Sequence, residues 1–170
     1  MFSEYLQGLL SPWRYRCGVN SPIEYEGRMP HKVKTLQGWY DEVWIKGDLD
    51  AIPKFLAPNA RSRGIMGDTP FSIEDLSELV TMVRELLGPI EITLPITMEQ
   101  DDWLSALVEI KSHSADTGDP VHVFGQVIAR FEGTQMVEIY TGTDSLTLFE
   151  QLSLLPENAM AVMLGGTRLR

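Results

Sequence analysis

The chain has few of the residues that indicate an oxidising compartment, a nucleic-acid partner or a membrane. It contains one cysteine, Cys17, so no disulfide can form within its 170 residues. The 14 basic residues against 24 acidic ones give a formal net charge of -10, whereas nucleic acids and anionic membranes require a basic surface. No apolar run approaches the roughly 20 residues of a membrane-spanning helix. These absences predict a cytoplasmic protein with neither a nucleic-acid nor a membrane partner.

The remaining composition is that of an ordinary soluble domain, with 44% hydrophobic and 22% charged residues. The length suits one domain with a sizeable core. We expect an irregular N-terminal arm at 1–31, a folded domain at 32–155 and a loose C-terminal tail at 156–170. The three histidines lie far apart in the sequence, and no His, Cys, Asp or Glu spacing suggests a metal site. No phosphate-binding loop is found, so no cofactor is predicted.

Hydrophobic periodicity predicts helices first and then a long antiparallel sheet, which is an α+β class. Ser72 and Asp75 predict a capping box at the start of one helix, with Asp in place of the usual Glu or Gln. Pro95 indicates an edge strand or a bulge. Turn signals join the last strands into an antiparallel meander. The predicted helices are 32–46, a short second helix after Asp48, 73–87 and 145–153, and the predicted strands are 60–66, 90–99, 103–113, 121–132 and 135–142.

The most informative segment is 40–59, where an aromatic amphipathic helix runs into Gly-Asp-Leu-Asp at 47–50 and then a second short helix. Further pieces follow in order, at 129–133, 137–140 and the Gln-Leu pair at 151–152. Over about residues 33–155 the chain resembles the SnoaL-like polyketide cyclases, the ketosteroid isomerases and nuclear transport factor 2. This resemblance implies a curved, mostly antiparallel sheet wrapped around helices as a cone with a central pocket.

The positions that carry catalytic acids in these families are filled differently here. Counting from the Gly-Asp-Leu-Asp sequence, the resemblance places the isomerase's hydrogen-bonding tyrosine at Tyr40, its carboxylate base at Gly64 and its second oxyanion donor near Val127. The acid/base residue of the polyketide cyclases falls on Thr141. Glycine and valine cannot transfer protons, so the usual catalytic acids are absent and the catalytic residues remain unassigned.

The inward faces of the expected strands and helices predict a mostly apolar pocket. Tyr40 and Thr141 are the candidates for polar contact with a ligand, and Asp68 is a candidate base at the rim. The alternatives remain open: Tyr40 as a core residue, Thr141 as a β-former, and Asp68 as an exposed turn residue. The predicted ligand-binding residues are Tyr40, Trp44, Phe55, Gly64, Met66, Asp68, Val83, Val127 and Thr141.

The function predicted from these residues is binding of a small, largely apolar carbonyl-type molecule in the cone pocket. The resemblance implies an isomerase, cyclase or dehydratase. A non-catalytic carrier or sensor and a dimeric protein-interaction module are the alternatives. Alternation along 121–132 places Phe124 and Ile128 on the outer face of the sheet, and a homodimer through this face is expected.

Overall fold

The computed structural model describes residues 31–63, 72–166 and 168. One curved sheet of five strands organises them, in the order β1-β5-β4-β3-β2. Only β1 and β5 pair in parallel, and the other neighbours are antiparallel. The predicted α+β class and the antiparallel meander are therefore confirmed. The strands are β1 (Leu56–Arg63), β2 (Glu91–Gln100), β3 (Trp103–His113), β4 (Pro120–Glu132) and β5 (Gln135–Thr143).

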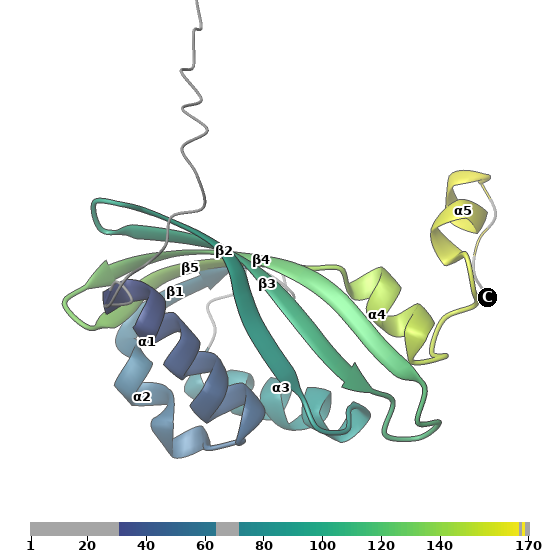
Figure 1. Cartoon of the computed structure of the whole chain (residues 1–170), viewed down its shortest axis with the longest axis horizontal. Coiled ribbons are helices and arrows are strands. Elements are labelled where there is room, and N and C mark those ends of the chain that lie inside the picture. The colour runs from purple at the N-terminus through teal and green to yellow at the C-terminus, as the bar shows by residue number, and fades with distance from the viewer. Residues whose placement is uncertain (1–30, 64–71, 167, 169–170) are drawn as a thin grey trace, which may run out of the picture.

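The helices that precede β2 cover one side of the sheet. Figure 1 shows the sheet curving over α1, α2 and α3, with α4 beside the far end of β4 and α5 beyond it. None of the helices in the described part of the chain is long and apolar enough to cross a bilayer. They are α1 (His31–Trp39), its π-helical continuation η1 (Tyr40–Ile45), the 3-10 helix η2 (Leu49–Ala51), α2 (Ile52–Phe55), α3 (Ile73–Leu86), α4 (Ser145–Gln151) and α5 (Ala159–Leu164).

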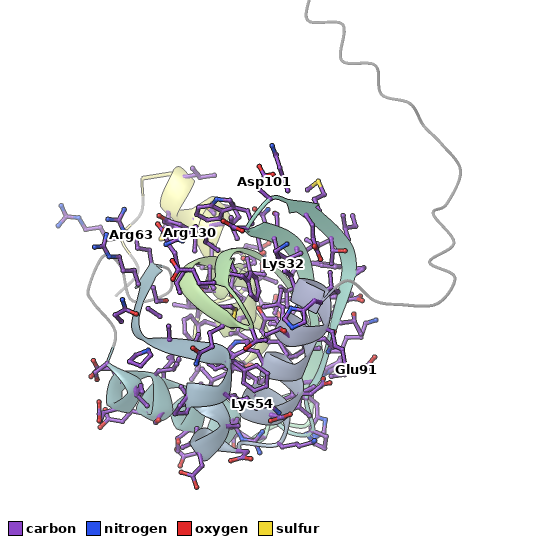
Figure 2. The ribbon with its side chains drawn as sticks, turned by 90° about the vertical axis from the view of Figure 1, so that its left-hand side faces the viewer. Lys32, Lys54, Arg63, Glu91, Asp101 and Arg130 are labelled. Carbon is purple, nitrogen blue, oxygen red and sulfur yellow. The ribbon has the colours of Figure 1, made fainter. Side chains whose placement is uncertain are left out.

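The core lies between the helices and the concave face of the sheet. Strand β4 shows how the sequence specifies this, because its residues are alternately buried and exposed along most of its length. A strand with this alternation can bury its apolar set only in one register. The buried residues of β4 are Val121, Val123, Gly125, Val127, Ala129 and Phe131, which is the inner face that the sequence predicts. Charged side chains lie at the periphery, as Figure 2 shows for Lys54, Arg63, Glu91 and Asp101.

Side chains from α3 hold the ends of two helices. Arg84 donates to the carbonyl oxygen of Trp44 at 2.7 Å and also to that of Ile45, which satisfies two carbonyls at the end of η1. Gly47 follows with φ of 77°, the left-handed conformation that glycine adopts without strain. The predicted capping box at the start of α3 is also present, with Ser72 and Asp75 joined by hydrogen bonds of 3.1 and 3.2 Å. The Arg84 bonds fix α3 against η1, and the capping box fixes where α3 begins.

The side chain of Gln151 hydrogen-bonds the backbone of β4 where no strand pairs with it. The pairing of β5 with β4 ends at Thr143, opposite Gly125, so the backbone of His122 lies beyond it. The amide of Gln151 accepts from the His122 N–H at 2.8 Å and donates to the His122 carbonyl at 3.2 Å. These two bonds satisfy backbone groups that would otherwise need water. Gln151, the first residue of the Gln-Leu pair noted in the sequence, thus satisfies the unpaired edge of β4 at His122.

Two features differ from the sequence-based expectation. Strand β1 begins at Leu56, directly after the short α2, and its pairing with β5 shifts between Leu56 and Arg61. The predicted tail contains a helix, α5, anchored by the buried Ala159. The predicted N-terminal arm lies outside the described residues except for His31. Strand β2 is an edge strand with a register shift between Thr93 and Ile96, as Pro95 predicts.

Candidate ligand-binding site

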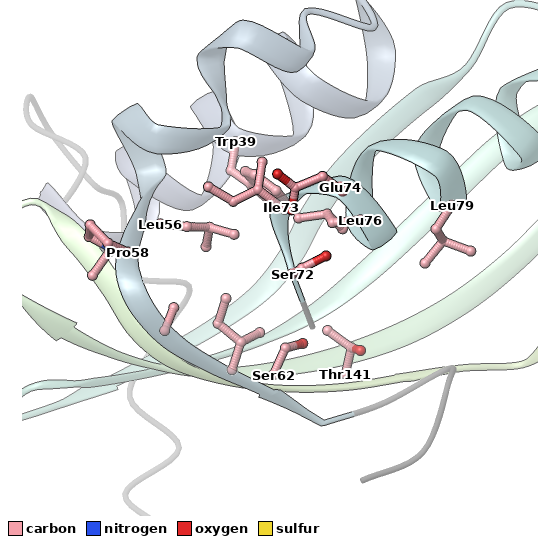
Figure 3. Close-up of a pocket in the computed structure, with 13 residues that line it drawn as sticks. Trp39, Leu56, Pro58, Ser62, Ser72, Ile73, Glu74, Leu76, Leu79 and Thr141 are labelled. Carbon is pink, nitrogen blue, oxygen red and sulfur yellow. The ribbon is translucent and has the colours of Figure 1, made fainter. Parts of the chain in front are cut away.

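A cavity of about 330 Å³ opens between the sheet and the start of α3. Its floor is formed by β1 and β5, and its opposite wall by the first two turns of α3 (Figure 3). Trp39, at the end of α1, closes one side. The described residues that line it are Trp39, Leu56, Ala57, Pro58, Ala60, Ser62, Ser72, Ile73, Glu74, Leu76, Leu79, Ile139 and Thr141.

Local periodicity explains why the walls are mostly apolar. On β1, Ala60 and Ser62 face the cavity, whereas Arg61 and Arg63 between and after them are exposed. On α3, Ile73, Leu76 and Leu79 recur every three residues and therefore share one face. The strand and the helix thus present small or apolar side chains to the same space, and the charged residues of β1 point away from it.

Two hydroxyl groups interrupt the apolar floor. Ser62 on β1 pairs with Ile139 of β5, and Thr141 lies two residues further along β5. Figure 3 shows the two side chains next to each other on the sheet side of the cavity. Neither hydroxyl forms a hydrogen bond within the described ranges. Both side chains are half-buried, so their hydroxyls are free to donate to a bound molecule.

The polar groups at the opposite wall are Ser72 and Glu74, both exposed. Ser72 already accepts from the Asp75 amide. Glu74 is the one ionisable residue among the described lining residues, and it lies at the solvent side of the cavity. No group of three His, Cys, Asp or Glu side chains that could hold a metal occurs within residues 31–63, 72–166 and 168. The described lining therefore offers hydrogen bonds and one negative charge at the opening.

The structure separates the residues predicted to bind ligand. Thr141 lines the cavity. Tyr40, Phe55 and Val127 are buried in the main core, with Trp44 packed against it, while Val83 packs against a smaller apolar cluster near α4. None of these five lines the described cavity. The remaining three predicted residues, Gly64, Met66 and Asp68, lie outside the described residues.

Tyr40 is a buried phenol at the first position of η1. Its hydroxyl forms no hydrogen bond with the described part of the chain. Desolvation by burial raises the pKa of Tyr40 well above its ordinary value of 10.0, because an ionised phenolate would lose its hydration there. The folded state therefore keeps this side chain neutral over a wider pH range than the unfolded chain does.

The variant Tyr40→Phe should be more stable than the wild type in alkali. The stabilisation from a neutral Tyr40 is complete below the unfolded pKa of about 10 and is lost as pH rises toward the higher folded value, at about 1.4 kcal/mol per pH unit. Urea unfolding at pH 8 and pH 11 gives the free energy of unfolding of both proteins. The value for Tyr40→Phe minus that for the wild type should be about 1 kcal/mol higher at pH 11 than at pH 8. An equal gap at both values would show that the hydroxyl is hydrated in the folded state.

The same variant tests the predicted contact between Tyr40 and a ligand. If the Tyr40 hydroxyl binds the ligand, its removal should weaken ligand binding by about 1–2 kcal/mol. A hydroxyl that only fills the core leaves the affinity unchanged, which is the result favoured by its position outside the described lining.

Several lining residues were not singled out by the sequence. Trp39 is the clearest case, since it follows Leu36 by three residues on the buried face of α1 and packs edge-on against Phe55 at 6.0 Å between ring centroids. Ser62 and Ile139 share the inner face with Thr141, so strand parity could have grouped them with it. Nothing in the sequence distinguishes a side chain that borders a cavity from one that fills the core.

The curved sheet covered by helices agrees with a family comparison. The model of the SnoaL-like domain matches residues 36–139, more than half of the chain. The chain belongs to the SnoaL-like domain family. A comparison with curated proteins finds no match.

Solved structures share the fold at low sequence identity. The proposed polyketide cyclase IdmH from Streptomyces antibioticus has a TM-score of 0.63 and 18% identity, over 71% of this chain and 96% of that one. A proposed polyketide cyclase from Acidithiobacillus ferrooxidans has a TM-score of 0.66 and 16% identity, over 75% and 98% of the two chains. AclR, a proposed hydroxylase from Streptomyces galilaeus, has a TM-score of 0.61 and 17% identity, over 79% and 90%. At such identities the likeness establishes the SnoaL-like cone fold and not the reaction.

Proposed function

We propose that this SnoaL-like protein binds a small, largely apolar carbonyl compound in the cavity between β1, β5 and α3. The observation that carries the proposal is an apolar cavity with two hydroxyls that have no partner among the described residues. Ligand sites are commonly apolar hollows with a few polar groups that orient the ligand, and about 300–1,000 Å³ is their usual size. The volume of about 330 Å³ lies at the lower end of this range.

Family membership supports use of the cavity, and the similar structures include proteins proposed to be cyclases and a hydroxylase. If the protein is an enzyme, the reaction that fits this pocket is proton transfer beside a carbonyl, as an isomerase, cyclase or dehydratase performs. A carrier or sensor needs only the binding step. The described lining favours binding, since Glu74 is its single ionisable group and lies at the solvent side.

The proposal is tested by native mass spectrometry of the purified protein, followed by release and identification of what it carries. A neutral, apolar oxygen compound is the expected finding. Incubating that compound with the protein in D₂O separates the two modes, because an enzyme would exchange hydrogens next to the carbonyl and a carrier would return the compound unchanged. Failure of apolar compounds to bind at millimolar concentration would remove the proposal.

We also propose a homodimer through the outer face of the sheet. The outer-face patch consists of Phe124 and Ile128 of β4, each 45% exposed, and Ile96 and Met98 of β2, which are more exposed still. Ion pairs lie at both ends of this patch, including His122 with Glu109 at 2.8 Å and Arg130 with Glu132 at 2.9 Å. An apolar centre with a polar rim is the usual arrangement of a protein interface.

The double variant Phe124→Lys, Ile128→Lys should halve the mass observed in sedimentation equilibrium. It places two positive charges at the centre of the outer-face patch, where a second copy would present the same charges. The matched control is Met82→Lys, Leu86→Lys, which changes two exposed apolar residues of α3 and should leave the dimer intact. A wild-type protein that sediments as a monomer would exclude the dimer.

A further inference from the structure

We propose that the cavity selects a neutral, single-ring ketone or aldehyde, whose oxygen accepts hydrogen bonds from both Ser62 and Thr141. This inference depends on the proposed ligand-binding function and adds three limits to it: the size of the ligand, the location of its oxygen and its charge. Each limit follows from a different property of the described lining.

The volume limits the size. A water-sized group occupies about 30 Å³ in a liquid, so a cavity of about 330 Å³ holds about eleven such groups. This matches a single carbon ring with short substituents. A fused four-ring skeleton has about twice as many atoms, so it would exceed this volume and part of it would lie outside the solvent opening.

The hydroxyl pair locates the oxygen. Ser62 and Thr141 belong to neighbouring parallel strands and lie together on the floor of the cavity (Figure 3). Each hydroxyl has one donor, and a carbonyl oxygen has two lone pairs, so one ligand oxygen can accept from both. The other lining residues of β1 and β5 are Leu56, Ala57, Pro58, Ala60 and Ile139, whose side chains carry no polar atom. The carbonyl end of the ligand therefore points to the sheet and its hydrocarbon part toward α3 and Trp39.

The charges of the described lining residues disfavour acids. No lysine, arginine or histidine occurs among the described lining residues, and the single ionisable one is the acidic Glu74. A carboxylate moved from water into an apolar cavity without a cation loses much of its hydration free energy. The net charge of -10 adds a general repulsion of anions. A ligand with a ketone or aldehyde avoids both penalties.

Matched probes test the three limits by isothermal titration calorimetry on the full chain. The ketone carvone should bind about tenfold more tightly than limonene, the hydrocarbon with the same skeleton. Perillaldehyde should likewise exceed perillic acid by at least about tenfold. Progesterone, a four-ring ketone, should bind at least about tenfold more weakly than carvone.

Variants then assign the oxygen to the hydroxyl pair. Ser62→Ala with Thr141→Val removes both donors with little change in volume, and it should abolish the preference for carvone while limonene binds as before. Thr143→Val is the matched control, because Thr143 lies on β5 outside the cavity lining, and it should keep the preference.

The outcomes separate the two proposals. Equal binding of carvone and limonene to the wild type, or a preference that survives in the double variant, would overturn the inference and leave the ligand-binding function standing. Tight binding of perillic acid or progesterone would also overturn it. Absence of binding by every probe would overturn the proposed function and the inference together.

Discussion

Replacing Ala60 by tryptophan should reduce the affinity for carvone at least about 100-fold, or about 2.7 kcal/mol. Ala60 lies on β1 beside Ser62, and its side chain faces the cavity. An indole at this position would occupy the space that the ligand needs, between the sheet and Leu76. The fold should survive, because the new side chain enters an existing void, and overpacking of a filled core typically costs about 1–3 kcal/mol.

The control for this experiment is Asn59→Trp. Asn59 precedes Ala60 on the same strand, but it is exposed and does not line the cavity. Calorimetry should show wild-type affinity for carvone in this variant, and urea unfolding should confirm that both variants are folded. If Ala60→Trp binds carvone normally, the ligand occupies another site.

Replacing Val127 by aspartate should lower the free energy of unfolding by about 3–5 kcal/mol at neutral pH. Val127 is 1% exposed and is paired between Ala106 of β3 and Thr141 of β5. It lies in the packed core and does not border the described cavity. A carboxylate there would have neither water nor a cation, so the position to which the resemblance assigns a catalytic acid cannot hold one at low cost.

The pH dependence identifies the cause of this loss. Burial would raise the pKa of the new aspartate in the folded state, so the deficit should shrink as pH falls to about 4 and grow as pH rises above it. Thr134→Asp is the control, since Thr134 is exposed in the turn that follows β4, away from the outer-face patch, and it should change stability by less than about 0.5 kcal/mol. A small, pH-independent loss at Val127 would mean that solvent or the cavity reaches this residue.

Much of the fold could be predicted because local chemistry specifies it. The alternation along β4, the capping box at Ser72 and the proline in β2 each determine the conformation of their own segment. The resemblance over residues 33–155 then orders these segments as a cone, and the family match at 36–139 confirms it. The sequence did not predict the beginning of β1 or the helix α5, since both segments are short and have weak periodicity.

The site was predicted less completely. Parity indicates that Val127 and Thr141 face inward on neighbouring strands, and both do. Only Thr141 borders the cavity, whereas Val127 is covered by core side chains. Similarly, Tyr40 and Trp39 are adjacent on the first helix, and the structure places Trp39 at the cavity. The ligand-binding roles of Tyr40, Phe55 and the other core residues remain predictions.

The sequence by itself indicated the family, the α+β class, and the inward and outward faces of the strands. The replacement of the usual acids by Gly64, Val127 and Thr141 remains a prediction from the resemblance. Only the tertiary structure decided where the cavity lies, which hydroxyls meet in it, and that Gln151 completes the edge of β4. The physical reason is that periodicity reports which side of an element is buried. Whether a buried side is filled or hollow depends on the volumes of side chains that meet from α1, α3, β1 and β5.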